Sequence, residues 1–150
     1  MEPGRATDPH LLDVLGELQR REPIFHRPEF GTTRGDFEAM MTQDFWETGA
    51  SGSRYTRDVV LDVLERRHAH PHDDPWETSD FQCLQIAPDN FLLTYTLRQG
   101  ERVTRRATIW RRTEDGFKIV YHQGTVVAKD APPVAVPEDR TAGTRQQEPT

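Results

Sequence analysis

The segment 109–125 constrains the fold more than any other part of the chain, because its pattern is that of one complete β-hairpin. Asp115-Gly116 is a two-residue turn signal, and the residues on either side of it alternate with a period of two. This alternation predicts that Trp110 and His122 face the same side of a sheet. An indole and an imidazole on one concave face suit a pocket for a small molecule.

The composition predicts one soluble domain with a single core. The chain has 150 residues, 34% of them hydrophobic, a formal net charge of −6 and one cysteine, Cys83. One cysteine excludes an internal disulfide, and no apolar run is long enough for a signal peptide or a membrane span, so we expect a cytoplasmic protein without membrane contact. The acidic balance argues against nucleic-acid binding. Arg102, Arg105, Arg106, Arg111 and Arg112 cluster, but on alternating strand faces, so we expect a solvated outer sheet face and not a nucleic-acid site.

Both ends of the chain are too polar and too rich in proline to bury much surface. We therefore predict disordered tails at 1–7 and 129–150 around one domain at 8–128. Three helices are expected in the first half of this domain. The first follows Asp8-Pro9 and ends at Pro23, the second follows Thr33, and the third follows Thr56.

In the second half of the chain the hydrophobic period changes from 3.6 to 2. Strands are expected at 77–87, 90–98, 102–112 and 117–127, and a small hairpin joins 45–48 to 53–55 between the second and third helices. The predicted fold class is α+β, in which a curved antiparallel sheet wraps round the N-terminal helices and forms a cone-shaped cup with a cavity at its open end.

Several motifs carry a resemblance to a known family, namely "DFWE" at 44–47, "GASG" at 49–52, "RY" at 54–55, "YTL" at 95–97, "TIWRR" at 108–112 and "HQGT" at 122–125. With the order of elements, they resemble the nuclear transport factor 2-like superfamily, and within it a branch of unknown function. The resemblance spans about residues 8–127 and implies a fold like that of ketosteroid isomerases and polyketide cyclases. It also implies a homodimer through the outer sheet face. Because the superfamily holds isomerases, cyclases, dehydratases and non-catalytic binding or association domains, it leaves the activity open.

The ketosteroid isomerases allow a sharper comparison, since the resemblance implies where their catalytic groups would lie. Thr108 stands where their protonated aspartate would be, and Thr48 or Gly49 stands where their base would be. The first predicted helix offers no tyrosine for the oxyanion hole. The resemblance therefore implies a shared scaffold and not a shared reaction.

Strand parity predicts an apolar cup for a flat or aromatic organic ligand. The expected ligand-binding residues are Tyr55, Phe91, Leu93, Tyr95, Thr108, Trp110, Val120 and His122. Histidine has the ordinary pKa nearest to neutrality, and Glu47 is the carboxylate of matching parity, so the candidate catalytic pair is Glu47 and His122. In the alternative interpretation both residues have only a structural role: His122 donates to a neighbouring carbonyl oxygen, and Glu47 contacts Arg54 across the hairpin.

Two functions remain open from the sequence. In one, the protein is a small-ligand binding or association module. In the other, it is an isomerase, cyclase or dehydratase that moves a proton on a small organic acid or a polyketide-like compound, with His122 as base and Tyr95 or Tyr55 as hydrogen-bond donor.

Three further features of the sequence have the chemistry of a site. His26 lies in a loop expected over the mouth of the cup, either facing a ligand or at the surface. The histidines and aspartates of 68–74 have metal-binding chemistry but lie in a proline-containing loop, so we expect a linker and no metal. Asp80 is expected to cap a strand or pair with an arginine. No phosphate-binding glycine loop, cysteine pair or serine elbow is present in the sequence, so no cofactor is predicted.

Overall fold

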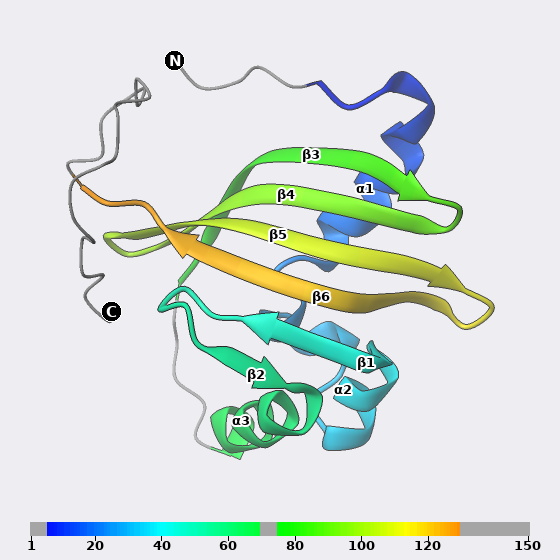
Figure 1. Ribbon diagram of the computed structural model, residues 1–150. Helices are drawn as coiled ribbons and strands as arrows, with labels where there is room; N and C mark the ends of the chain where they lie inside the picture. The colour runs from blue at the N-terminus through cyan, green and yellow to red at the C-terminus, as the bar shows by residue number, and fades with distance from the viewer. Residues whose placement is uncertain (1–5, 70–74, 130–150) are drawn as a thin grey trace, which may run out of the picture.

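The computed structural model describes residues 6–69 and 75–129 (Figure 1). One mixed sheet curves around the core in the strand order β2-β1-β6-β5-β4-β3. Its strands are β1 Met41–Thr48, β2 Arg54–Thr56, β3 Glu77–Ala87, β4 Asn90–Gln99, β5 Arg102–Thr113 and β6 Gly116–Val126. The helices are α1 Leu12–Arg21, α2 Arg34–Ala39 and α3 Arg57–Ala69, with short 3₁₀ turns η1 Pro9–Leu11, η2 Ile24–His26 and η3 Pro28–Phe30. This arrangement confirms the predicted α+β class.

The 3₁₀ turn η1 and the helix α2 begin where a side chain accepts a free backbone N–H. The carboxylate of Asp8 accepts a hydrogen bond from the backbone N–H of His10 at 3.3 Å, with Pro9 in the first helical position. At α2 the hydroxyl of Thr33 accepts from the N–H of Asp36 at 3.1 Å, and the Asp36 carboxylate accepts from the N–H of Thr33 at 3.1 Å. Thr33 and Asp36 therefore form a capping box at the predicted start of this helix.

The apolar residues Phe37, Met40 and Met41 have helical spacing, but α2 ends at Ala39, two residues before Met41. Met41 is instead the first residue of β1. The backbone N–H of Ile119 donates to the carbonyl oxygen of Met40 at 2.8 Å, so a sheet contact replaces the next helical hydrogen bond.

The four long strands form the predicted antiparallel meander, and the turn between the last two consists of Glu114 and Asp115, one residue before the predicted Asp115-Gly116, so that Gly116 begins β6. Gly116 has φ +102°, a conformation that glycine adopts without a Cβ clash. The β1–β2 hairpin lies beside the last strand, where β1 pairs with β6 in parallel and places Glu47 opposite His122. This parallel pair is a departure from the wholly antiparallel sheet that was expected.

A β-bulge in β6 changes which residues face inward. Ile109 pairs with Tyr121, but Trp110 pairs with Ile119, so Val120 is the extra residue. Ile119 is fully buried, whereas Val120 is only half-buried. The expectation that Val120 lies on the concave face is wrong because the bulge shifts the parity of β6 by one residue.

Helices cover one face of the sheet and leave the other open. In Figure 1, α1 lies behind the long strands, while α2 and α3 lie at the edge formed by β1 and β2. The core between helices and sheet is apolar and contains Leu11, Leu18, Ile24, Phe37, Phe45, Leu61, Leu64, Phe91, Leu93, Leu97, Trp110 and Ile119. No helix within the described ranges is long and apolar enough to span a membrane.

Candidate functional site

A cavity of about 290 Å³ lies at one end of the inner sheet face. Its apolar wall comes largely from α3 and from the segment that follows α1, and includes Ile24, Phe25, Val60 and Leu64. Its polar wall consists of Glu22, His26, Glu47, Tyr55, Arg67, Arg102, Arg106 and His122. An apolar surface with a few convergent polar groups is typical of sites for small molecules.

The two candidate catalytic residues lie next to each other on this wall. The parallel register of β1 and β6 brings Glu47 opposite His122, and the Glu47 Oε2 lies 3.1 Å from the His122 Nδ1. The His122 side chain is 9% exposed and that of Glu47 is 20% exposed. The alternative pairing of Glu47 with Arg54 is not formed, because Tyr55 and not Arg54 is the cross-strand neighbour of Glu47.

Arg106 determines the protonation pattern of the imidazole. Its Nη1 lies 3.3 Å from the His122 Nε2. A guanidinium has only donors, so the Nε2 must accept this hydrogen bond with its lone pair. The proton of the neutral ring is then on Nδ1 and is donated to Glu47. His122 is thus oriented by an acid on one side and covered by a cation on the other.

A second carboxylate, Glu22, lies buried where the cavity meets the core. It is 2% exposed and directly follows α1. The Glu22 Oε2 accepts from the Tyr95 hydroxyl at 2.7 Å and from the backbone N–H of Ile24 at 3.2 Å, while its Oε1 accepts from the Trp110 Nε1 at 3.1 Å. Three donors therefore hold this buried carboxylate.

The Tyr95 hydroxyl donates to Glu22 and keeps its proton to unusually high pH. Burial is the main reason that the pKa of the Tyr95 phenol lies well above its ordinary value of 10.0, and the nearby Glu22 carboxylate raises it further. Arg106 acts in the opposite direction with a smaller effect. Tyr95 is therefore a fixed hydrogen-bond donor at neutral pH.

The structure separates the predicted ligand-binding residues into two groups. Tyr55 and His122 line the cavity, together with Glu47. Five others point inward but belong to the core and do not line this cavity, namely Phe91, Leu93, Tyr95, Thr108 and Trp110. Their half of the cup is filled because α1 and the segment 22–30 pack against it. Val120, the eighth predicted ligand-binding residue, does not line the cavity because the bulge in β6 turns it away from the inner face.

Thr108 occupies the position where the isomerases carry a protonated aspartate, according to the resemblance. It is fully buried, and its hydroxyl has no hydrogen-bond partner among the residues that the structure describes. It pairs across the sheet with His122. The position holds a hydroxyl and no acid, which agrees with a scaffold that lacks the isomerase groups.

The other histidines have separate surroundings. His26 lies in η2 and lines the cavity, which is one of the two positions that the sequence left open for it. His68 lies in the last turn of α3 and packs against Phe37 with ring centroids 5.2 Å apart. Residues 70–74 of the predicted linker lie outside the described residues. Within 6–69 and 75–129, no group of three or more histidine, cysteine or acidic side chains is arranged to hold a metal.

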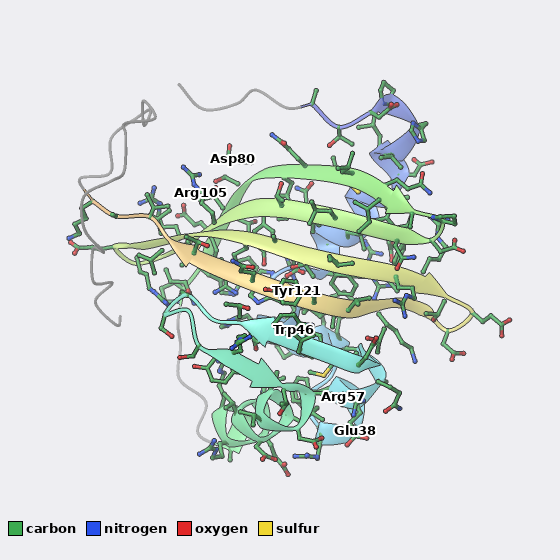
Figure 2. The ribbon with its side chains drawn as sticks, in the orientation of Figure 1. Glu38, Trp46, Arg57, Asp80, Arg105 and Tyr121 are labelled. Atoms are coloured by element: carbon green, nitrogen blue, oxygen red, sulfur yellow. The ribbon has the colours of Figure 1, made fainter. Side chains whose placement is uncertain are left out.

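Asp80 confirms the expectation of an arginine partner. Its carboxylate lies 3.7 Å from the Arg105 Nη1 and accepts from the Thr96 hydroxyl at 3.2 Å. Figure 2 shows Asp80 and Arg105 close together on the face of the sheet that α1 does not cover. Asp80 is therefore a structural residue outside the cavity.

The sequence interpretation missed the arginines of the cavity and the buried Glu22. Arg102 and Arg106 were assigned to the solvated outer face, but both line the cavity. The sequence does indicate their position, because every second residue from Trp110 back to Arg102 lies on the same face of β5. Arg102 and Arg106 therefore share the inner face with Trp110. Glu22 carries no comparable signal, because it is an acidic residue at a helix end without periodic neighbours.

Comparison with known proteins supports the fold. No family model and no curated protein sequence matches the chain, so the proposed branch of unknown function remains a prediction.

Solved structures do match. A nuclear transport factor 2-like protein from Cytophaga hutchinsonii is 12% identical with a TM-score of 0.61, covering 77% of this chain and 97% of its own. A cystatin-like-fold protein from Caulobacter vibrioides is 17% identical with a TM-score of 0.60, covering 75% and 89%. A candidate ketosteroid isomerase from Parabacteroides distasonis is 14% identical with a TM-score of 0.60, covering 83% and 96%. The chain therefore has the nuclear transport factor 2-like fold that its sequence motifs predict.

Proposed function

We propose that the protein binds a small organic ligand in the cavity beside His122. The observation that carries this proposal is the meeting of Glu47, Arg106 and His122, from three different strands, on the wall of one cavity. The volume of about 290 Å³ lies at the lower end of the range for small-molecule sites. A compact ligand with one polar end fits this arrangement better than a large apolar one.

A thermal-shift screen of small organic compounds tests this proposal. A ligand at a hundred times its dissociation constant adds about 2.7 kcal/mol to the free energy of unfolding, which is readily seen as a rise in Tm. Val63→Trp fills the cavity from α3 and should abolish the shift. Val59→Trp is the matched control, since Val59 is an exposed residue of the same helix that does not line the cavity. An equal shift in both variants would place the ligand elsewhere.

A second candidate function is proton transfer on the bound ligand. It is favoured by the orientation of His122, because its Nδ1 donates to Glu47 and its Nε2 becomes available as a base once the contact with Arg106 opens. Tyr55 lines the cavity and is the available phenol, whereas the Tyr95 hydroxyl is held by Glu22.

The test uses a ligand from the screen. His122→Ala should lower its turnover roughly 10²-fold or more. The enzyme interpretation fails if this ligand binds with unchanged affinity and no conversion by the wild type is detected by mass spectrometry.

We also propose that a second copy of the chain covers the outer sheet face, as the family resemblance implies. A row of apolar side chains crosses five neighbouring strands there: Leu84, Leu92, Ile109, Tyr121 and Trp46. Figure 2 shows Trp46 beside Tyr121, and their ring centroids are 4.5 Å apart. Leu84 and Trp46 are 50% and 44% exposed in the single chain.

Analytical ultracentrifugation tests the dimer. The wild type should sediment as a dimer, and Leu84→Glu should sediment as a monomer because it places a charge in the apolar row. Val59→Glu is the control, since it changes an exposed apolar residue on α3. A monomeric wild type at micromolar concentration would contradict the proposal.

A further inference from the structure

The cavity wall carries positive charge that its own acids do not neutralise. Glu22 already accepts hydrogen bonds from three donors, and Glu47 accepts one from His122. Arg102 and Arg106 also line the cavity, and neither forms an ion pair within residues 6–69 and 75–129. Both acids thus accept from protein donors, whereas Arg102 and Arg106 form no ion pair with either of them among the described residues.

Arg106 is the more deeply placed of these two cations. It is half-buried, and its Nε donates to the Thr104 hydroxyl at 3.2 Å while its Nη1 donates to the His122 Nε2 at 3.3 Å. These acceptors are neutral, as is the Tyr95 hydroxyl that Arg106 also contacts. A guanidinium has five N–H donors in a planar fork that matches a carboxylate, and a charge-assisted pair is about twice as strong as a neutral hydrogen bond. A carboxylate entering the cavity would therefore offer Arg106 a better partner than either acceptor.

Arg102 extends the cationic surface toward the mouth of the cavity. It lies four residues before Arg106 on β5, on the same face of the strand, and its side chain is exposed. An exposed cation at the entrance attracts an anionic ligand over a distance of about 8–10 Å at ordinary salt concentration. The two arginines thus mark one route into the cavity.

The contact between Arg106 and His122 has a chemical consequence. While Nη1 donates to the Nε2 lone pair, this lone pair cannot accept a proton from a ligand. A protonated ring would present an N–H to the guanidinium and lose the contact. The same arginine therefore covers the basic atom of the imidazole.

From this geometry we propose that the cavity selects small organic acids, and that the ligand carboxylate replaces His122 as the partner of Arg106. This rests on the proposed ligand-binding function and names the chemical class of its ligand. Binding of the acid uncovers the His122 Nε2, which then faces the rest of the ligand. A neutral ligand of the same shape leaves Arg106 on His122 and the basic atom covered.

The direct test is an NMR titration with acetate, which is the simplest carboxylate and needs no knowledge of the natural ligand. Acetamide at the same concentration is the neutral control, and sodium chloride keeps the ionic strength equal. We expect acetate to shift the imidazole resonances of His122 and the Nε–H resonance of Arg106 in a saturable manner. We expect acetamide to leave both unchanged.

Variants assign the response to Arg106. Arg106→Gln should remove the His122 response to acetate and weaken binding of larger acids, such as phenylacetate, at least tenfold. Arg106→Lys keeps the charge without the planar fork and should retain part of the response. Arg105→Gln is the matched control, because Arg105 is the neighbouring residue on the opposite face of β5 and does not line the cavity. Circular dichroism establishes that each variant is folded.

The possible results separate this inference from the proposed function. If phenylacetamide stabilises the protein as much as phenylacetate does, or if Arg106→Gln binds acids like the wild type, selection for acids is wrong while ligand binding in the cavity stands. If acetate moves the His122 resonances in Arg106→Gln as in the wild type, the exchange of partners is wrong. If neither acids nor amides bind in the wild type, the inference and the proposed function both fail.

Discussion

The two ends of the inner sheet face differ, although the same strands form both. At the closed end, Trp110 and Leu93 are buried under α1 and the segment that follows it. At the open end, Arg106 and His122 line a cavity. Glu22 stands between them, because it accepts from Trp110 and also lines the cavity. The comparison indicates that the length of α1, which ends just before Glu22, determines how much of the face is core and how much is site.

The largest effect is expected from emptying the closed end. Trp110→Ala should lower the free energy of unfolding by about 3–5 kcal/mol, because it leaves a cavity in the core and removes a donor from Glu22. Urea denaturation measures this change. Trp46→Ala, at the exposed outer face, should cost less than about 1 kcal/mol unless it also disturbs a dimer. Equal costs for the two substitutions would contradict the assignment of Trp110 to the core.

The next effect concerns the boundary between the two ends. Glu22→Ala should cost about 3 kcal/mol, because the Tyr95 hydroxyl, the Trp110 Nε1 and the N–H of Ile24 lose their acceptor in a buried place. Glu22→Gln should cost less, since its carbonyl oxygen still accepts. The control Glu17→Gln changes a partly exposed ion pair on α1 and should cost less than about 1 kcal/mol. If Glu22→Ala left the free energy of unfolding unchanged, the Glu22 carboxylate would not be buried.

The strands were predictable from the sequence because local signals determine where they begin and end. Turn residues such as Asp115 and Gly116 mark the ends of strands, and the observed bounds of the four long strands agree with prediction to within one residue. The capping box at Thr33 and Asp36 marks α2 in the same way. Alternation along β5 and β6 also placed Trp110 and His122 on the inner face, where both are buried.

The rest depends on contacts between distant segments. The parallel pairing of β1 with β6 joins segments more than sixty residues apart, and nothing local in either segment indicates it. The bulge at Val120 has no glycine or proline to mark it. The filling of the closed end depends on where α1 lies, and the buried position of Glu22 follows from the same placement. These features determine the cavity, so the site was less predictable than the fold.

An effect of pH is expected from Tyr95. Because burial, and next the Glu22 carboxylate, raises the pKa of the Tyr95 phenol above 10.0, the folded state holds this proton more tightly than the unfolded state. Its contribution to stability is complete below pH 10 and is lost as the pH rises further. The loss amounts to at most about 1.4 kcal/mol per pH unit.

Urea denaturation between pH 9 and pH 12 measures this slope. Tyr95→Phe should unfold more easily at pH 8 but show a shallower alkaline loss than the wild type. Tyr121→Phe, on the outer face, should keep the wild-type slope. The same slope in Tyr95→Phe and the wild type would contradict the buried phenol.

The smallest effect on stability is expected at the open end. Glu47→Gln should cost about 1 kcal/mol, because its carbonyl oxygen can still accept from the His122 Nδ1 next to a solvated cavity. Any loss of ligand affinity or turnover in Glu47→Gln, expressed as a free energy, should exceed this loss in the free energy of unfolding. Parallel urea and binding measurements give the two numbers. A cost like that of Trp110→Ala would mean that the open end is core as well.

A crystal structure of the protein soaked with phenylacetate tests the central claim most directly. We predict density for the ligand beside His122, with its carboxylate on Arg106 and with Trp110 still bonded to Glu22 in a filled closed end. The claim is that the inner sheet face is core at one end and a ligand site at the other. It would be contradicted by side chains that fill the space between Glu47 and α3, or by ligand density beside Trp110.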